Sequence, residues 1–428
     1  MGFKKKVLVF PCGSEIGLEL HRSLSRVKEV VLYGGNSEPD HGRYVYARYF
    51  ETLPYVGEPH FLDCLNELVE KNGIDYVYPA HDSAVLEFSR AQDQGLLACR
   101  AVVAPYETCR ICRSKRATME YFRKEVRTPT LYNCEDDIKT WPVFLKPDVG
   151  QGSKGTFKAA TAELCRLFRQ QDSSLLLMEY LPGLEFTVDC FTDSCGVLVF
   201  VQPRTRTRIM NGISVRTSFV IDPRLVDMAH IINKKMTFKG AWFFQVKLTG
   251  DGEPALMEIA PRIAGAMGLC RGAGVNLPLM SIYDAEGHTV QPMLNPSVKE
   301  MDRALYGRFR LDFVYRHVYV DLDDCLVCNG QVNAELVRFL FQCFNRGVKL
   351  HLLTRHAGTP AEALSQFRLG MMFDTITHIT DKSAKAQYIR HMDAIFIDDS
   401  FCERKAVYDA LRISVFAPDA VEVLFAKD

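Results

Sequence analysis

Two aspartates follow an apolar run near the C-terminal end of the chain. The run spans residues 317–320, and Asp321 and Asp323 come just after it. An ionised Asp321 can attack phosphorus, while Asp323 can protonate the leaving oxygen and then activate water. These residue types therefore indicate phosphoryl chemistry through an aspartyl phosphate.

Three further polar side chains end two later apolar runs of the same segment. Thr354 ends the run 348–353, where a hydroxyl suits a phosphoryl oxygen, and Asp398 and Asp399 end the run 394–397. Because parallel α/β folds place their sites at the C-terminal ends of strands, we expect these side chains to converge with the first two aspartates. Four carboxylates at one edge would repel each other without a cation, so the four aspartates predict an Mg²⁺ site.

A second set of residues, earlier in the chain, suits a nucleotide polyphosphate. Lys146 lies on a short apolar run and precedes the glycine-rich segment 148–156. Loop amides can approach phosphate oxygens without side-chain interference, and ammonium groups neutralise phosphate charge. The segment is not a Walker loop, because Lys154 precedes a glycine instead of following one. Taken alone, it is equally typical of an ordinary glycine-rich hairpin. The candidate phosphate-binding residues of the segment are Gly152, Ser153 and Gly155.

A break between two strand-like runs could hold the base and sugar of the nucleotide. The apolar run 175–178 leads through Glu179, Tyr180 and Leu181 to a Pro-Gly turn and an alternating strand. Backbone groups at such a break can hydrogen-bond an adenine edge, and Glu185 is placed to accept from ribose hydroxyls. A surface hairpin with solvated glutamates is the alternative.

The third set is a predicted hairpin with an oxygen-bearing pair. Runs 242–248 and 255–259 flank a polar turn, and a hairpin centred between Asp251 and Gly252 places Gln245 opposite Glu258. Directly opposed residues share a face, so this pair suits hard Mg²⁺. Arg262, just beyond the hairpin, could stabilise a transferring phosphoryl group. The neighbours predicted to point to the apolar face are Phe244, Val246, Met257 and Ile259.

In order and spacing, these three motifs resemble the ATP-grasp superfamily over residues 113–285. The resemblance is closest to the branch with the carbamoyl phosphate synthetase large subunit and the pyrrolysine-pathway ligase. Residues 1–112 resemble the Rossmann-like pre-ATP-grasp domain. The resemblance implies that Lys115 and Lys146 bind phosphate, that residues 179–181 form the adenine hinge, and that Glu185 binds ribose. It also implies Gln245 and Glu258 as magnesium ligands.

One position departs from the family pattern Glu-x-Asn-x-Arg. The chain has Ala260 where the asparagine is common. A methyl group cannot coordinate a metal, so the sequence predicts that a second magnesium is held more weakly or by other groups.

The C-terminal motifs resemble the haloacid dehalogenase-like (HAD-like) superfamily in its phosphatase form, over residues 310–428. The resemblance implies Asp321 as nucleophile, Asp323 as acid and base, and Thr354 as the second-motif hydroxyl. Lys385 is the predicted third-motif lysine, with Lys382 a close rival. The chain leaves no room for a cap, which implies a bulky substrate or a lid supplied by the ATP-grasp part.

Strand-like runs that alternate with helical patterns predict an α/β protein with three domains. These are a pre-ATP-grasp Rossmann-like domain at 1–112, a two-lobed α+β ATP-grasp domain at 113–300, and a small capless HAD-like parallel α/β domain at 309–428. Residues 295–308 are the predicted linker.

Composition limits the classes of partner. The 428 residues include 52 Lys and Arg and 52 Asp and Glu, so the formal net charge is zero. That balance disfavours a nucleic-acid or anionic-membrane binder. No run is long and apolar enough for a signal peptide or membrane span, which predicts a cytoplasmic protein. The 14 cysteines are expected to be reduced thiols.

The combined expectation is an ATP- and Mg²⁺-dependent ligase, with Mn²⁺ as an alternative ion. It would join a small-molecule carboxylate to an amine or related nucleophile, and the C-terminal domain would act on a phosphorylated substrate. Two rivals stay open: bicarbonate activation of the carbamoyl-phosphate type, and a phosphatase regulated by an ATP-binding module. A homodimer is also left open.

Two weaker signals remain from the sequence. Arg204, Arg206 and Arg208 alternate along one strand, where they could bind a substrate carboxylate or phosphate, or form a solvated basic face. His81 and Asp82 end a strand and are expected to be a structural pair.

Overall fold

A computed structural model of the chain describes residues 4–150, 152, 154–210, 212–307, 309 and 311–425. Ser153, predicted to bind phosphate, lies outside the described residues. The chain divides into two compact units, residues up to Leu305 and residues from Tyr306, and each is described by itself. The division falls within the predicted linker 295–308, but part of that linker is a strand, β16.

Unit 1 begins with a parallel sheet whose strand order is β3-β2-β1-β4-β5. Residues Val7, Leu8 and Val9 of the first strand are fully buried, as expected for a strand covered on both faces. The apolar run 101–104 forms a strand only at its first residue, in β5. The elements are β1 (Lys5–Phe10), α1 (Glu15–Leu24), β2 (Val30–Gly35), β3 (Tyr49–Phe50), α2 (Phe61–Asn72), β4 (Tyr76–Pro79), α3 (Asp82–Asp93) and β5 (Arg100–Ala101).

Two antiparallel sheets of four strands follow within unit 1. The first has the order β6-β9-β7-β8 and the second has the order β11-β10-β14-β15. Helices α4 (Tyr106–Arg113) and α5 (Lys115–Phe122) precede them. The first sheet contains β6 (Leu131–Tyr132), β7 (Val143–Lys146), β8 (Phe157–Ala159) and β9 (Leu176–Glu179), with helix α6 (Ala162–Gln171). The second contains β10 (Glu185–Thr192), β11 (Leu198–Thr205), β14 (Gly240–Leu248) and β15 (Pro254–Ala260), with helix α7 (Pro223–Lys235).

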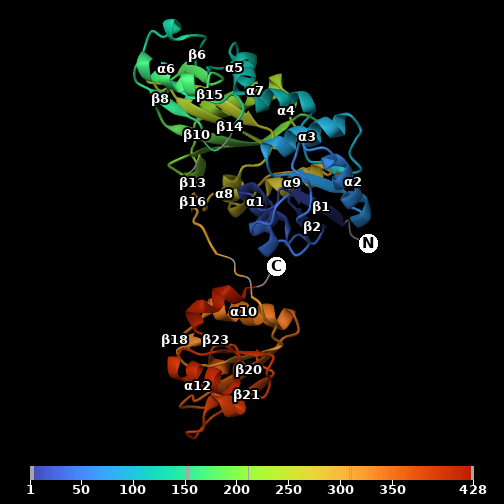
Figure 1. Cartoon of the computed structure of the whole chain (residues 1–428), viewed down its shortest axis with the longest axis vertical. Coiled ribbons are helices and arrows are strands. Elements are labelled where there is room, and N and C mark those ends of the chain that lie inside the picture. The colour runs from blue at the N-terminus through green and yellow to red at the C-terminus, as the bar shows by residue number, and fades with distance from the viewer. Residues whose placement is uncertain are drawn as a thin grey trace. The chain divides into compact units, whose positions relative to one another are not determined.

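The last sheet of unit 1 is small and is formed by segments that are far apart in sequence. Its order is β12-β13-β16, from β12 (Arg208–Met210), β13 (Ile213–Ser218) and β16 (Glu300–Asp302). Helices α8 (Gly268–Gly272) and α9 (Leu277–Ala285) lie between the second sheet and β16 in the chain. Figure 1 shows α9 beside β1 and β2 of the N-terminal layer.

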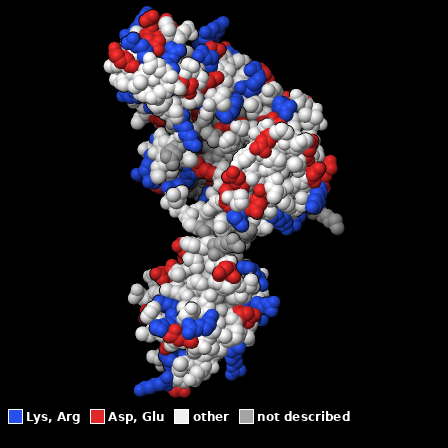
Figure 2. Space-filling model, viewed as in Figure 1, with Lys and Arg blue, Asp and Glu red and all other residues white. Residues whose placement is uncertain are grey.

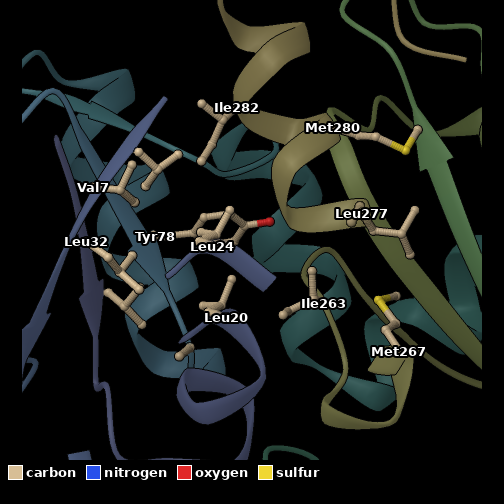
Figure 3. Packing of buried hydrophobic residues seen from close by; sticks show 14 of the residues in the cluster. Val7, Leu20, Leu24, Leu32, Tyr78, Ile263, Met267, Leu277, Met280 and Ile282 are labelled. Carbon is tan, nitrogen blue, oxygen red and sulfur yellow. The ribbon is translucent and has the colours of Figure 1, made fainter. Parts of the chain in front are cut away.

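One hydrophobic core joins the N-terminal layer to the segment after β15. Figure 3 shows Leu20, Leu24 and Tyr78 on one side of this core, facing Ile263 and Leu277 on the other. Because these side chains share one core, the N-terminal layer is fixed against the second half of unit 1. The boundary predicted near residue 112 therefore lies inside one compact unit, and the three-domain division stays a prediction.

Unit 2 is a small α/β layer with a fully parallel sheet of order β21-β20-β17-β22-β23. Its strands are β17 (His317–Val320), β20 (Lys349–Thr354), β21 (Thr375–His378), β22 (Ala394–Ile397) and β23 (Ser414–Phe416). A short hairpin, β18 (Val327–Cys328) with β19 (Gln331–Val332), follows the first strand. The helices are α10 (Ala334–Asn345), α11 (Pro360–Gln366) and α12 (Phe401–Leu411).

The surface agrees with the zero net charge. On the face shown in Figure 2, Lys and Arg side chains are interspersed with Asp and Glu side chains in both units. Each described helix is either too short or too polar to span a lipid bilayer. The described cysteines are free thiols, as predicted.

Candidate active sites

Unit 1 contains a cavity of about 1040 Å³ that is lined by both four-stranded sheets and by loops of the N-terminal layer. Lys146 and Tyr180 line it from the first sheet and its connection, and Gln245 and Glu258 line it from the second sheet. The three sequence motifs, which are far apart in the chain, therefore meet at one cavity.

Gln245 and Glu258 are paired directly across β14 and β15. The predicted register is therefore confirmed at this pair. Phe244, Val246 and Ile259 are buried on the apolar face, as predicted. Met257 is not: the strand register shifts beside Gln245, and Met257 lines the cavity next to Glu258. A β-bulge places an extra residue on one strand, which the assumption of a regular hairpin could not anticipate.

Two lysines lie near Glu258. Lys146 is 5% exposed, and burial lowers the pKa of its ammonium group to about 8 although Glu258 acts in the opposite direction. Burial also lowers the pKa of Lys115, and again Glu258 opposes the shift. The Lys115 ammonium donates to the backbone oxygens of Asp148 and Gly150, at 3.1 and 3.3 Å. A cavity wall with two partly desolvated ammonium groups beside a carboxylate suits a polyphosphate with a divalent cation.

The glycine-rich segment borders the same cavity. Gly150, Gly152 and Lys154 line it. Gly152 has φ 66° and Gly155 has φ 68°, in the left-handed region that favours glycine. At Gly155 a Cβ atom would lie 3.2 Å from Cγ of Pro147, so the turn itself requires a glycine there.

The predicted hinge also borders the cavity, through Glu179, Tyr180 and Leu181. The side chain of Glu179 is engaged by Arg127, whose Nη2 lies 2.7 Å from Oε1. Its backbone nitrogen donates to Thr130 at 2.9 Å. The backbone groups of Tyr180 and Leu181 therefore remain for a ligand. Such groups can hydrogen-bond an adenine edge.

Glu185 has a partner that the sequence did not predict. Arg206 Nε lies 2.6 Å from its Oε1, and both residues line the cavity. Arg206 comes directly after β11, whose preceding strand begins at Glu185, so the pair follows from the strand pairing.

Arg262 is held by Asp82 of the N-terminal layer in a two-pronged ion pair, with N–O distances of 2.7 and 2.8 Å. Burial would raise the pKa of Asp82, but Arg262 outweighs that effect and holds the pKa below its ordinary value. The guanidinium also lies over the ring of Phe243, 5.3 Å from its centroid. Asp82 therefore has a structural role, as expected: its carboxylate fixes the orientation of Arg262 at the cavity that both residues line.

In unit 2, Asp321, Asp398 and Asp399 come together at the C-terminal ends of the central strands. Within the described part of the chain, one carboxylate oxygen of each lies within 4.8 Å of one oxygen of each of the other two. Lys385 bridges two of them, with Nζ 2.8 Å from Asp321 and 2.6 Å from Asp398. Lys382 is exposed. The position of Lys385 favours it over its rival.

Desolvation dominates this cluster. Burial raises the pKa of Asp321 to about 6 although Lys385 opposes the shift, and burial also raises the pKa of Asp398. A divalent cation bound here would replace the proton that this environment favours, so the donor set fits Mg²⁺.

Asp323 and Thr354 are placed beside that cluster but have partners of their own. The carboxylate of Asp323 lies 2.9 Å from Nδ1 of His356, which the sequence did not single out. Asp323 is not a member of the three-carboxylate group described above. The hydroxyl of Thr354 is buried and accepts from the His356 backbone nitrogen at 3.1 Å.

A second group in unit 2 consists of three histidines, His317, His351 and His391. Nδ1 of His317 lies 3.0 Å from Nε2 of His351, and the rings of His317 and His391 are stacked with centroids 3.5 Å apart. The nearly parallel rings, 5° apart, cannot both direct an in-plane nitrogen at one ion, so this group is a packed hydrogen-bonded cluster.

Comparisons with known proteins bear on unit 1. Residues 171–304 match a family model described as ATP-grasp in the biosynthetic pathway with Ter operon. No curated protein matches the sequence.

Three solved structures similar to the chain are all 14% identical to it. The biotin carboxylase domain of Hydrogenobacter thermophilus 2-oxoglutarate carboxylase has a TM-score of 0.56, over 68% of this chain and 71% of that one. An L-amino acid ligase from Bacillus licheniformis has a TM-score of 0.53, over 67% and 75%. The N5-carboxyaminoimidazole synthetase from Staphylococcus aureus has a TM-score of 0.55, over 69% and 81%.

At this identity the solved structures establish the fold. The two four-stranded sheets around one cavity, the matched residues 171–304 and the similar solved structures agree. Unit 1 of this chain has the ATP-grasp fold.

Proposed function

We propose that unit 1 is an ATP-dependent ligase that activates a small-molecule carboxylate as an acyl phosphate and transfers it to an amine or a related nucleophile. The observation that carries this proposal is the direct pairing of Gln245 with Glu258 in the cavity that Lys146 also lines. Together they offer oxygen ligands for a cation and an ammonium group for a polyphosphate.

Each side chain has a stated task in this proposal. The backbone after β9 receives adenine, Glu185 receives the ribose hydroxyls, and Lys115 and Lys146 hold phosphate oxygens. Gln245 and Glu258 would hold Mg²⁺, which when bound neutralises polyphosphate charge. Arg262, oriented by Asp82, would face the transferring phosphoryl group, a step that needs positioning and charge neutralisation rather than covalent help from the protein.

The similar solved structures support the choice of nucleotide and ion. The Hydrogenobacter structure contains MgADP, ADP and bicarbonate, and the Staphylococcus structure contains ADP. The Bacillus structure is an L-amino acid ligase, which supports ligation, whereas the bicarbonate in the Hydrogenobacter structure supports the bicarbonate alternative. The Hydrogenobacter domain was solved as a dimer, and a homodimer of this chain stays a prediction.

For unit 2 we propose an Mg²⁺-dependent phosphatase of the HAD-like kind. Asp321 would attack phosphorus, displace the leaving oxygen and form an aspartyl phosphate that water then hydrolyses. Asp323 would donate the proton to the leaving oxygen and take one from water, and Lys385 would hold the charge of Asp321 and Asp398. Thr354 is proposed to face a phosphoryl oxygen. The convergence of these residues on one strand edge supports the proposal.

The ligase proposal is tested by ADP release with Mg²⁺, ATP and a panel of amino acids and hydroxy acids. Substrate-dependent ADP release that is lost in Glu258→Gln is the expected result. Nucleotide binding without turnover for any panel member would instead favour an ATP-binding regulator. This alternative is supported by Ala260, which cannot coordinate a metal. If the two units catalyse successive steps of one pathway, Asp321→Asn should change the overall product. An unchanged overall product would exclude this coupling.

A further inference from the structure

Arg204 is a buried arginine with one hydrogen-bonding group unused. The residue is 1% exposed, and it lines the cavity of unit 1. Its Nε and Nη2 donate to the two carboxylate oxygens of Asp189 at 2.7 and 3.1 Å. Its Nη1 is buried and has no hydrogen-bond partner among the residues that the structure describes. A buried charged donor without a hydrogen-bond partner lowers the stability of the fold. Its presence in a residue that lines a cavity therefore indicates a role in binding.

Asp189 holds this arginine in place. Asp189 is fully buried, and it also accepts from the thiol of Cys270 at 3.4 Å. Because both carboxylate oxygens bind one side of the guanidinium, the direction of the remaining Nη1 group is fixed. The pair therefore holds the guanidinium, with its unpartnered Nη1, in a fixed orientation within a residue that lines the cavity.

The strand pairing locates Arg204 relative to the proposed metal ligands. Arg204 pairs with Thr187, Thr187 pairs with Gln245, and Gln245 pairs with Glu258, so the four form one row on the cavity face of the sheet. Strands are about 4.8 Å apart, which puts the Arg204 backbone roughly 10 Å from that of Gln245. Arg204 therefore lies two strands away from Gln245 and three strands away from Glu258 in this row.

Three of the other arginines that line the cavity are paired with carboxylates of the chain. Arg262 is held by Asp82 and Arg206 by Glu185. Arg303, which lines the cavity too, contacts Glu15 through Nη1, while its Nε is buried without a hydrogen-bond partner. Among the described residues, the buried arginine donors without a hydrogen-bond partner at this cavity are Nη1 of Arg204, Nε of Arg206 and Nε of Arg303, although Nε of Arg206 lies 2.6 Å from the Glu185 carboxylate.

We propose that Arg204 forms a subsite for a second anionic group of the substrate, separate from the carboxylate that is activated. The substrate class is a small molecule with a reacting carboxylate and a further carboxylate or phosphate. This inference rests on the proposed ligase function for the identity of the molecule, but the anion subsite is a property of the cavity itself.

The kinetic test compares carboxylate substrates that carry one anionic group, called monoanions here, with matched substrates that carry two anionic groups, called dianions. Suitable pairs are valerate with glutarate, alanine with aspartate, and serine with O-phosphoserine. ADP release should depend on the dianion. The first two pairs test a second carboxylate, and the third pair tests a phosphate. Arg204→Lys keeps a cation for Asp189 but loses the branched donor, so it should raise KM for the dianion at least tenfold and leave KM for ATP unchanged.

The matched control is Arg216→Lys, at an exposed arginine that pairs with Glu300 on β16. It should leave both KM values unchanged. Equal use of monoanions and dianions by the wild type would overturn the proposal, as would an unchanged dianion KM in Arg204→Lys.

A second measurement does not depend on ligase activity or on the stability of the variant. Crystals of the wild-type chain are soaked in sodium bromide, and bromide is located by anomalous scattering. An ion in hydrogen-bond contact with Arg204 Nη1 is the expected result. Bromide bound elsewhere but absent from Arg204 would contradict the subsite, and an ion that persists in a folded Arg204→Lys protein would be an adventitious ion only. If no panel member releases ADP, the ligase function fails while the bromide result still decides the subsite.

Discussion

Gln245 and Glu258 face each other across β14 and β15, although the strands leave their turn in a different register. Near the turn Val246 pairs with Leu256, and the shift that follows brings Glu258, instead of Met257, opposite Gln245. The bulge thus puts two oxygen-bearing side chains on one face beside Lys146 and Lys115, whose pKa values both respond to Glu258.

Replacement of one member of the pair should weaken the response of nucleotide binding to Mg²⁺. Gln245→Leu removes one oxygen ligand and leaves both lysines in place. We expect the Mg²⁺ concentration needed for half-maximal ATP binding to rise at least tenfold, about 1.4 kcal/mol. Calorimetric titration at fixed Mg²⁺ concentrations measures this. Gln171→Leu, at an exposed position on α6, is the control, and an unchanged Mg²⁺ requirement in Gln245→Leu would exclude its role as a ligand.

ATP binding should take up a proton near pH 8. Burial lowers the pKa of Lys146 to about 8, so part of the free protein has a neutral amine at that pH. An anionic polyphosphate favours the charged form, so affinity should fall as the pH rises through about 8. Calorimetry in buffers of different ionisation enthalpy counts the proton. Lys146→Arg, whose charge does not titrate in this range, should abolish the uptake, and uptake that persists would assign it to another group.

Mg²⁺ binding to unit 2 should strengthen as the pH rises through about 6. The pKa of Asp321 is raised to about 6 by burial, so below that pH a proton competes with the cation for the carboxylate. The increase in melting temperature caused by Mg²⁺ should therefore be larger above pH 6 than below it. Asp398→Asn should remove the effect, and a pH-independent shift in the wild type would argue against Asp321 as a ligand.

Unit 2 should lose stability in acid through His351. Burial, with a smaller effect from His317 and His391, lowers the pKa of His351 to about 4, below the ordinary value near 6.5. The unfolded chain then binds a proton more readily than the folded one, so the stabilising effect of the neutral ring is complete above pH 6.5 and declines toward pH 4.

The measurement is the melting temperature of wild type and His351→Gln across that range. The difference between them should shrink or reverse in acid. His230→Gln, at an exposed histidine of α7, should follow the wild type at every pH. Parallel curves for wild type and His351→Gln would assign the acid sensitivity elsewhere.

Local patterns were enough to predict the strands and the motif residues that end them. Val143–Lys146, His317–Val320 and Ala394–Ile397 are strands because short apolar runs end in polar residues, which is legible in the sequence. The Gln245–Glu258 pairing was predicted as well, but the register near the turn differs by one residue, and the bulge beside Gln245 produces the predicted pairing.

What the sequence could not predict depends on long-range packing. Asp82 and Arg262 are far apart in the chain and meet only because a shared core joins the N-terminal layer to the segment after β15. The same applies to Arg204, whose pairing with Asp189 and burial distinguish it from the exposed Arg208 on the next strand. Alternation alone placed these arginines on one face but could not tell a buried donor from a solvated one.

If the chain forms an acyl phosphate, hydroxylamine should trap it, and this test requires no knowledge of the natural nucleophile. The carboxylate panel is incubated with ATP, Mg²⁺ and hydroxylamine, and hydroxamate is measured beside ADP. We predict hydroxamate in equal amount to ADP for at least one carboxylate, and neither product with Glu258→Gln, while Glu253→Gln in the exposed turn behaves as wild type. ADP formed without hydroxamate, or at the same rate without any carboxylate, would exclude an acyl phosphate intermediate.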